Sequence, residues 1–269
     1  MDNLEGNLRN LFVEFNIPGP LFQTALSHLK NKIFLQNPDI YLPLTTKDAP
    51  LSSEKLRPQL DDIDLLLLNL FAAQAAKAEY TKRGIPQDVY DATMGCFSRF
   101  INETYASKGI YTFDRHFWTY RQTSLRLFRL GTLEYEFIDG DAAVHIPSDA
   151  SLSPKNVEES LRAFSDFSTR YFPDKPAKRI TCLSWLLSPE IGSLLGPGSN
   201  IKSFQSLFEI TSESKPTEDY LFWLFGVDTL QNINELKEDT SLQRGVKKHL
   251  LKGDVIHNGF GILKGRDEL

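Results

Sequence analysis

The chain of 269 residues carries 30 Lys and Arg against 35 Asp and Glu, which gives a formal net charge of −5, and 41% of its residues are hydrophobic. This composition is typical of a folded globular protein, and without a basic stripe it excludes nucleic acid as an expected partner. Cys96 and Cys182 are too few for a disulfide framework, so we expect a reducing, cytoplasmic setting.

No membrane or targeting segment is predicted. The first ten residues, MDNLEGNLRN, lack the basic start and the apolar core of a signal peptide. The most apolar run, Ile63 to Ala76, is interrupted by polar residues and predicts a buried helix rather than a membrane span. The last four residues, Arg266 to Leu269, resemble an ER-retention signal, which we interpret as a coincidence because no translocation signal accompanies it.

Residues 1–122 predict a helical N-terminal domain. Apolar residues at helical spacing run from Leu4 to Phe15, and a second helix is expected at about Leu21 to Phe34. The segment from Asn37 to Pro58 holds four prolines and predicts a loop or an extended arm. Pro58 and Pro86 are each expected to open a helix, and these two helices are expected to end near Gly84 and Gly109.

The pattern changes to strand spacing in residues 123–269. Apolar residues alternate with polar ones from Leu133 to Phe137, and the dipeptide Asp139-Gly140 predicts a hairpin turn. The return strand is expected at Ala142 to Pro147. Ser153 is then expected to cap a helix that begins at Pro154. The apolar run from Ile180 to Leu187 predicts a strand that is buried on both faces.

The remaining predicted elements complete an α+β fold. Ser188-Pro189 begins a short helix that ends at Gly196, and Ser203 to Thr211 predicts another strand. The residues Thr240 to Gln243 form a capping box for a helix that ends at about Leu251. Asn258 to Leu263 is expected to be a final strand whose two glycines pack closely against a neighbour. The predicted architecture is a helical domain, 1–122, followed by a mixed sheet flanked by helices, 123–269.

Two phrases resemble a known family. They are SLRLFRLGTLEYEF with AVHIPSDASLS, and CLSWLLSPEIGSLLGPGSNIKSFQSLFEI. In order and wording they are similar to bacterial acyltransferase-domain proteins that pair a helical N-acyltransferase N-terminal domain with a GNAT-like C-terminal domain, and the resemblance covers most of the chain.

The resemblance implies direct transfer of an acyl group from acetyl-CoA or another acyl-CoA to a small-molecule acceptor, usually an amine, without a metal. Two strands that splay apart would hold the thioester, and the diphosphate would rest on the turn before the next helix. Transferred to this chain, the expected CoA-binding residues are Ile146, Ser148, Ser153, Trp185 and Asn200. The turn from Ser148 to Ser153 departs from the family pattern because it contains Asp149 and no glycine.

Three residues are candidates for the chemistry. His145 lies near the carboxyl end of a predicted strand and is suited to act as a general base, although a histidine held by a carboxylate in a polar niche is an equal alternative. Glu134 is the alternative base. It shares a strand face with Glu136, and this alternation favours the solvent face of an antiparallel edge. Ser184 would share a face with Cys182 and assist the departing thiolate, while Cys182 itself is expected to pack in the core.

Two other functions stay open at this stage. A catalytically inactive acyl-CoA or small-ligand binding protein of the same fold would explain the turn without glycine. A thioester hydrolase would use water in place of an amine. The five histidines lack the spacing of metal ligands, so no metal is expected, and the oligomeric state is not predicted.

Overall fold

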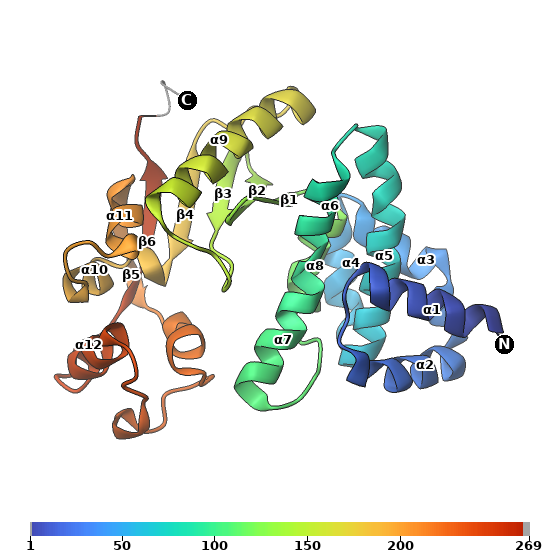
Figure 1. Cartoon of the computed structure of the whole chain (residues 1–269), viewed down its shortest axis with the longest axis horizontal. Helices are drawn as coiled ribbons and strands as arrows, with labels where there is room; N and C mark the ends of the chain where they lie inside the picture. Colours follow the sequence, from blue (N-terminus) through green and yellow to red (C-terminus); the bar gives the residue numbers. More distant parts are fainter. Residues whose placement is uncertain (1, 266–269) are drawn as a thin grey trace. The chain divides into compact units, whose positions relative to one another are not determined.

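The computed structural model describes residues 2–265, so the last four residues, whose likeness to a retention signal we interpret as a coincidence, lie outside the described residues. The chain divides into two compact units, Met1–Arg129 and Leu130–Leu269 (Figure 1). The N-terminal unit is helical, whereas the C-terminal unit combines a sheet with helices. The predicted α+β class is therefore confirmed.

The N-terminal unit is built around one long helix, α5 (Asp62–Lys82), which packs against α2, α8 and a 3-10 turn. The residues from Leu65 to Leu70 on α5 are all buried, so this helix forms the core of the unit. The other elements are α1 (Asp2–Glu14), η1 (Gly19–Leu21), α2 (Phe22–Asn31), η2 (Ile33–Gln36), α3 (Pro38–Tyr41), η3 (Leu42–Thr45), α4 (Ala49–Leu56), α6 (Gln87–Met94), α7 (Cys96–Lys108) and α8 (His116–Thr123).

The loop predicted for residues 37–58 is wrong. This segment instead forms α3, η3 and α4. Pro38, Pro43 and Pro50 each stand in the first turn of one of these short elements. A proline is tolerated there because the first N–H groups of a helix have no partner within the helix. These three prolines therefore begin helices, although the density of prolines in the sequence suggests that they break them.

Two other helix boundaries differ from the prediction. Helix α5 begins at Asp62 and not at Pro58, because the carboxylate of Asp61 accepts hydrogen bonds from the N–H groups of Ile63 and Asp64 and forms a capping box. The single helix predicted from Pro86 to Gly109 is two helices, α6 and α7, which meet at a turn at Gly95.

The sheet comprises six strands in the described residues, in the order β1-β2-β3-β4-β6-β5. Strand β3 pairs antiparallel with β2 and parallel with β4, and β6 pairs antiparallel with both β4 and β5. The predicted mixed sheet is confirmed. Its strands are β1 (Leu127–Leu130), β2 (Leu133–Ile138), β3 (Asp141–His145), β4 (Ile180–Ser184), β5 (Phe208–Pro216) and β6 (His257–Leu263).

Helix α9 (Pro154–Tyr171) lies across one face of the sheet (Figure 1). The Tyr135 ring of β2 stacks on Phe164 of α9, with ring centroids 4.4 Å apart, and Phe137 packs against Phe164 and Phe172. The odd-numbered residues of β2 therefore face α9. Because side chains alternate along a strand, the even-numbered residues of β2 face away from this helix.

A second core in the C-terminal unit forms beyond the end of β4. Its buried residues are Ile191, Tyr220, Leu221, Phe225, Leu236, Val246, Leu250 and Ile256. They come from α10 (Pro189–Leu194), the short π-helix η5 (Leu221–Phe225), α12 (Ser241–Leu250) and the segments next to them. The other elements of the unit are η4 (Trp185–Leu187), α11 (Asn200–Ser206) and η6 (Ile233–Glu235). The predicted capping box of Thr240 and Gln243 is confirmed at the start of α12.

Two strand predictions need correction, and one prediction of close packing holds. Strand β4 ends at Ser184 and not at Leu187, because the hydroxyl oxygen of Ser184 accepts the N–H of Leu186 and turns the chain into η4. The predicted strand from Ser203 starts only at Phe208, after α11. Gly259 of β6 packs tightly, since a Cβ there would lie 2.2 Å from the carbonyl oxygen of Leu187.

Candidate active site

The candidate active site lies where β3 and β4 part. Their parallel pairing runs from Ala142↔Ile180 to Val144↔Cys182 and does not extend further in the described residues. Strand β4 stays paired with β6 as far as Ser184↔Gly259. Pro147, which has no N–H to donate, follows β3 shortly after this point. The carboxyl ends of two parallel strands thus separate, which is where open sheets hold their ligands.

The face of the sheet opposite α9 carries a group of acidic side chains and one histidine. Glu134 and Glu136 of β2 are 2% and 3% exposed, and the end of β3 brings His145 directly opposite Glu134 in the strand register. The expectation that the two glutamates face solvent is wrong. Strand alternation correctly places both on one face, but the burial of that face depends on tertiary structure.

His145 and Glu136 form a hydrogen-bonded pair. The ring Nε2 lies 3.1 Å from the carboxylate Oε2, and the histidine side chain is 25% exposed against 4% for the glutamate. A carboxylate only accepts hydrogen bonds, so we assign the Nε2 proton to His145. This is the orientation that a general base requires, with a carboxylate to hold the ring.

Ser184 ends the second splayed strand. It lies on the same face as Cys182, which the register Tyr135↔Val144↔Cys182 places toward α9. The hydroxyl oxygen accepts the Leu186 N–H at 3.1 Å, and within residues 2–265 the hydroxyl proton has no hydrogen-bond acceptor. Burial raises the pKa of the Cys182 thiol to about 12, so this residue is a core group and not a nucleophile.

The turn between β3 and α9 contains the predicted phosphate-binding residues. Ile146 directly follows His145 at half-buried depth, Ser148 is exposed, and Ser153 caps α9 by accepting the N–H of Asn156 at 3.3 Å. Two backbone donors of this turn are already used in hydrogen bonds within the protein. The N–H of Ala150 donates to Pro147, and the N–H of Ser151 donates to the hydroxyl of Thr132. Fewer N–H groups therefore remain for an anion than at an uncapped helix start.

Two other predicted ligand residues follow β4 in the chain. Trp185 is the first residue of η4 and packs, half-buried, against the second core. Asn200 begins α11 and is exposed. Their predicted contacts with CoA stay predictions.

Sequence reasoning missed a second histidine–carboxylate pair. His257 Nδ1 lies 3.0 Å from Glu190 Oε1, and the Ser188 hydroxyl donates to Oε2 of the same carboxylate at 2.5 Å. The histidine and the glutamate are 67 residues apart, so no local motif joins them. The signal that the sequence offered was a histidine just before the final predicted strand. The structure then pairs this strand antiparallel with β4.

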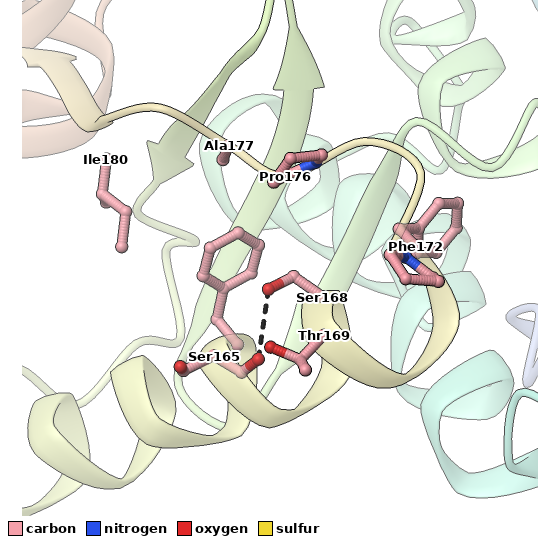
Figure 2. Close-up of a pocket in the computed structure, with 9 residues that line it drawn as sticks. Ser165, Ser168, Thr169, Phe172, Pro176, Ala177 and Ile180 are labelled. Carbon is pink, nitrogen blue, oxygen red and sulfur yellow. Dashed lines mark hydrogen bonds between the residues drawn. The ribbon is translucent and has the colours of Figure 1, made fainter.

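A cavity of about 310 Å³ lies at the opposite end of α9. It is lined by the last turns of α9 and the segment that leads into β4, and Figure 2 shows Ser165, Ser168 and Phe172 around it. Ser168 donates a hydrogen bond to the Ser165 carbonyl and so satisfies its own hydroxyl. Ile180, at the cavity, begins β4, whereas the strands part after Cys182. The cavity is therefore not part of the candidate active site.

A separate charged cluster lies in the N-terminal unit. His28, Asp61 and Asp64 bring possible metal-ligating atoms within 4.8 Å of one another. The ammonium of Lys32 already pairs with both aspartates, and Asp61 also caps α5. The positive charge that a cation would supply is therefore present, and the cluster serves the helix start. Among the described residues, no helix is both long and apolar enough to cross a membrane.

Comparison with protein-family models gives two adjacent matches. The model of the N-acyltransferase N-terminal domain matches residues 37–125, and the model of the GNAT-like C-terminal domain matches residues 127–263. A search of the curated proteins finds no match.

Solved structures of an acyltransferase share the fold at 21% identity. The complex with decanoyl-CoA and teicoplanin has a TM-score of 0.78 over 95% of this chain and 87% of that one. A mutant in complex with octanoyl-CoA has a TM-score of 0.80 over 96% and 88%, and the complex with CoA and 10C-teicoplanin has 0.79 over 95% and 87%.

Proposed function

Because the chain belongs to the family that joins an N-acyltransferase N-terminal domain to a GNAT-like C-terminal domain, we propose that it moves a medium-chain acyl group from acyl-CoA to the amine of a small-molecule acceptor. The predicted family and the predicted N-acyltransferase class are confirmed. The chain length of the donor, the acceptor and the roles of individual residues make up the proposal.

The observation that carries the proposal is the histidine–carboxylate pair at the parting strands. His145 ends β3, and its ring is held by the buried Glu136. His145 would take the proton from the attacking amine, while the N–H of Ile146 would polarise the thioester carbonyl. Glu134, opposite His145 in the register, adds a second carboxylate to the acceptor side.

The donor would enter from the other face. The diphosphate would rest on the turn from Ser148 to Ser153, at the start of α9, where the helix dipole favours an anion. Lys155 stands in the first turn of this helix with its side chain 82% exposed, and its charge would offset the exposed Asp149. Ser184 would donate a hydrogen bond to the thioester sulfur or to the pantetheine amide.

An apolar surface on the acceptor face suits a longer acyl chain. Leu183 of β4 is 51% exposed and pairs with Phe260 of β6, which is half-buried. A decanoyl chain that passed between the strands would cover these two side chains. The solved relatives in complex with octanoyl-CoA and decanoyl-CoA support this chain length.

A thermal-shift titration tests the donor. Octanoyl-CoA or decanoyl-CoA at a hundred times its dissociation constant should stabilise the protein by about 2.7 kcal/mol, which raises the melting temperature by roughly 5–10 °C for a chain of this size. Acetyl-CoA and free CoA serve as controls and should shift it less. A Leu183→Asp variant should lose the preference for decanoyl-CoA over acetyl-CoA. Equal shifts with all four ligands would reject the medium-chain donor.

Turnover is then measured as thiol release from decanoyl-CoA in the presence and absence of a primary amine. Thiol release that requires the amine supports the transferase. Release without any amine would instead show a thioester hydrolase.

One observation favours a second candidate function, a binding protein of the same fold without turnover. The turn from Ser148 to Ser153 has no glycine, exposes Asp149 and uses two of its own N–H groups in hydrogen bonds within the protein. Stabilisation by acyl-CoA without thiol release in any amine mixture would identify this function.

A further inference from the structure

The second histidine–carboxylate pair, Glu190 with His257, is built like a proton-transfer group. Glu190 Oε1 lies 3.0 Å from His257 Nδ1, and the fully buried Ser188 donates to the other carboxylate oxygen. Because the carboxylate accepts from Nδ1–H, the ring presents Nε2 outward. Among the described residues Nε2 has no hydrogen-bond partner, and the histidine side chain is 24% exposed, so a substrate atom can reach it.

The negative charge of Glu190 suits such a role. Burial by itself would raise the pKa of Glu190, but hydrogen bonds from the Ser188 hydroxyl, from the His257 ring and from backbone groups outweigh it and lower this pKa below the ordinary value. Glu190 is therefore a carboxylate at neutral pH. Its negative charge stands opposite the imidazolium that would deliver a proton.

The pair is held on a rigid part of the sheet. His257 begins β6, two residues before Gly259, which pairs with Ser184 at the end of β4. Gly259 packs directly against the carbonyl of Leu187, and Gln205 donates to the carbonyl groups of Leu186 and Ser188. These contacts fix η4 and the start of α10 against β6, and they therefore fix the position of Glu190 relative to His257.

The strand register places this pair on the face opposite to His145. Cys182 and Gly261 are paired, and the Cys182 face is the one that α9 covers. Ser184, Gly259 and His257 follow on the same face by strand alternation. The His145–Glu136 pair lies on the other face. The proposed diphosphate site at the start of α9 is on the His257 side, so the thiol would leave on this side and the amine would arrive on the other.

We propose that His257, positioned by Glu190, is the general acid that protonates the departing CoA thiolate. This inference rests on the proposed transferase function. The amine nitrogen forms a bond to the thioester carbonyl carbon and passes a proton to His145. The carbon–sulfur bond then breaks with its electron pair on sulfur, which takes the proton from His257 Nε2. The products are an amide and free CoA thiol. One proton has passed from the amine to His145 on one face of the sheet, and one has passed from His257 to the sulfur on the other face.

The test uses His257→Asn in the full chain. The amide N–H of asparagine stands near the position of the histidine Nδ1–H, so it keeps the hydrogen bond to Glu190 but has no proton to deliver. With decanoyl-CoA and hydroxylamine, the variant should lose about 100-fold or more in kcat, with the KM for decanoyl-CoA and the melting temperature close to those of the wild type. His249→Gln, on α12, serves as the matched control and should keep full activity.

A second donor distinguishes acid catalysis from a structural role. The thiolate of para-nitrothiophenyl decanoate needs little protonation to leave, so His257→Asn should lose less than about 3-fold relative to the wild type on this ester. Glu190→Gln, which changes a positioning residue, should show the same dependence on the leaving group to a smaller degree. An equal loss on both donors, or full activity of His257→Asn on decanoyl-CoA, would overturn the role of His257. No turnover by the wild type would overturn the transferase function together with it.

Discussion

The two histidine–glutamate pairs of the C-terminal unit differ in how the chain assembles them. His145 and Glu136 are nine residues apart on one hairpin, whereas His257 and Glu190 are 67 residues apart and meet only through the pairing of β6 with β4. In the first pair the histidine forms its hydrogen bond to the carboxylate through Nε2, and in the second pair it does so through Nδ1. One pair lies on each face of the sheet. In the transfer proposed above, proton removal and proton delivery would take place on opposite faces of the sheet.

The burial of the two carboxylates also differs. The Glu136 side chain is 4% exposed, while that of Glu190 is 25% exposed. A buried carboxylate must keep its partner, because an unpaired charge in a dry environment is strongly unfavourable. We therefore expect that removing the partner of Glu136 lowers the free energy of unfolding more than removing the partner of Glu190.

The largest effect is expected from His145→Gln. Glutamine keeps an N–H near the position of Nε2, so the contact with Glu136 and the fold should persist while the basic nitrogen is lost. We expect kcat for transfer from decanoyl-CoA to fall by about 10²–10⁴-fold. Unlike His257→Asn, this variant should be equally defective with para-nitrothiophenyl decanoate. Recovery of activity on that ester would assign the two histidines to the opposite roles.

A smaller effect, on stability, is expected from Gly259→Ala. The new Cβ would lie 2.2 Å from the Leu187 carbonyl oxygen, and a backbone atom cannot move aside as a flexible side chain can. The free energy of unfolding should fall by about 1–3 kcal/mol, as for other overpacked sites. The start of β6 should shift with His257, while the hairpin that carries His145 is unaffected.

Gly196→Ala is the control for this substitution, because a Cβ at Gly196 meets nothing within 4 Å. Denaturant unfolding measures both variants. Equal stability of the two would show that β6 and η4 are not in tight contact.

The smallest effect concerns pH. The pKa of Glu190 is lower in the folded protein than in the unfolded chain, so its contribution to stability is present above its ordinary value of 4.5 and is lost as the pH falls through the folded value. At about pH 7, Glu190→Gln should melt a few degrees below the wild type, by roughly 2–4 °C for a loss of about 1 kcal/mol. The difference should narrow below about pH 4.5.

Glu159→Gln provides the comparison for the pH measurement, since its side chain is 61% exposed on α9. Its melting temperature should follow that of the wild type throughout. A gap for Glu190→Gln that stays constant down to pH 4 would show that the Glu190 carboxylate contributes no charge-dependent stability.

Local sequence determined the elements that carry their own start and stop signals. The alternation from Leu133 to Phe137 and the Asp139-Gly140 turn predicted the β2–β3 hairpin, and Ser153 with Pro154 predicted the start of α9. The family phrases added the GNAT-like sheet and the N-acyltransferase class. The position of His145 at the end of a strand was predicted for the same reason.

Tertiary structure decided what lay beyond these local signals. The burial of Glu134 and Glu136 depends on what packs over their face of the sheet, which the alternation of residues along a strand cannot reveal. The short helices between residues 37 and 58 are stabilised by packing more than by helix propensity. Glu190 and His257 meet because β6 returns beside β4. A sequence therefore specifies which residues share a strand face, since that follows from backbone geometry, while long-range pairing alone brings together side chains 67 residues apart.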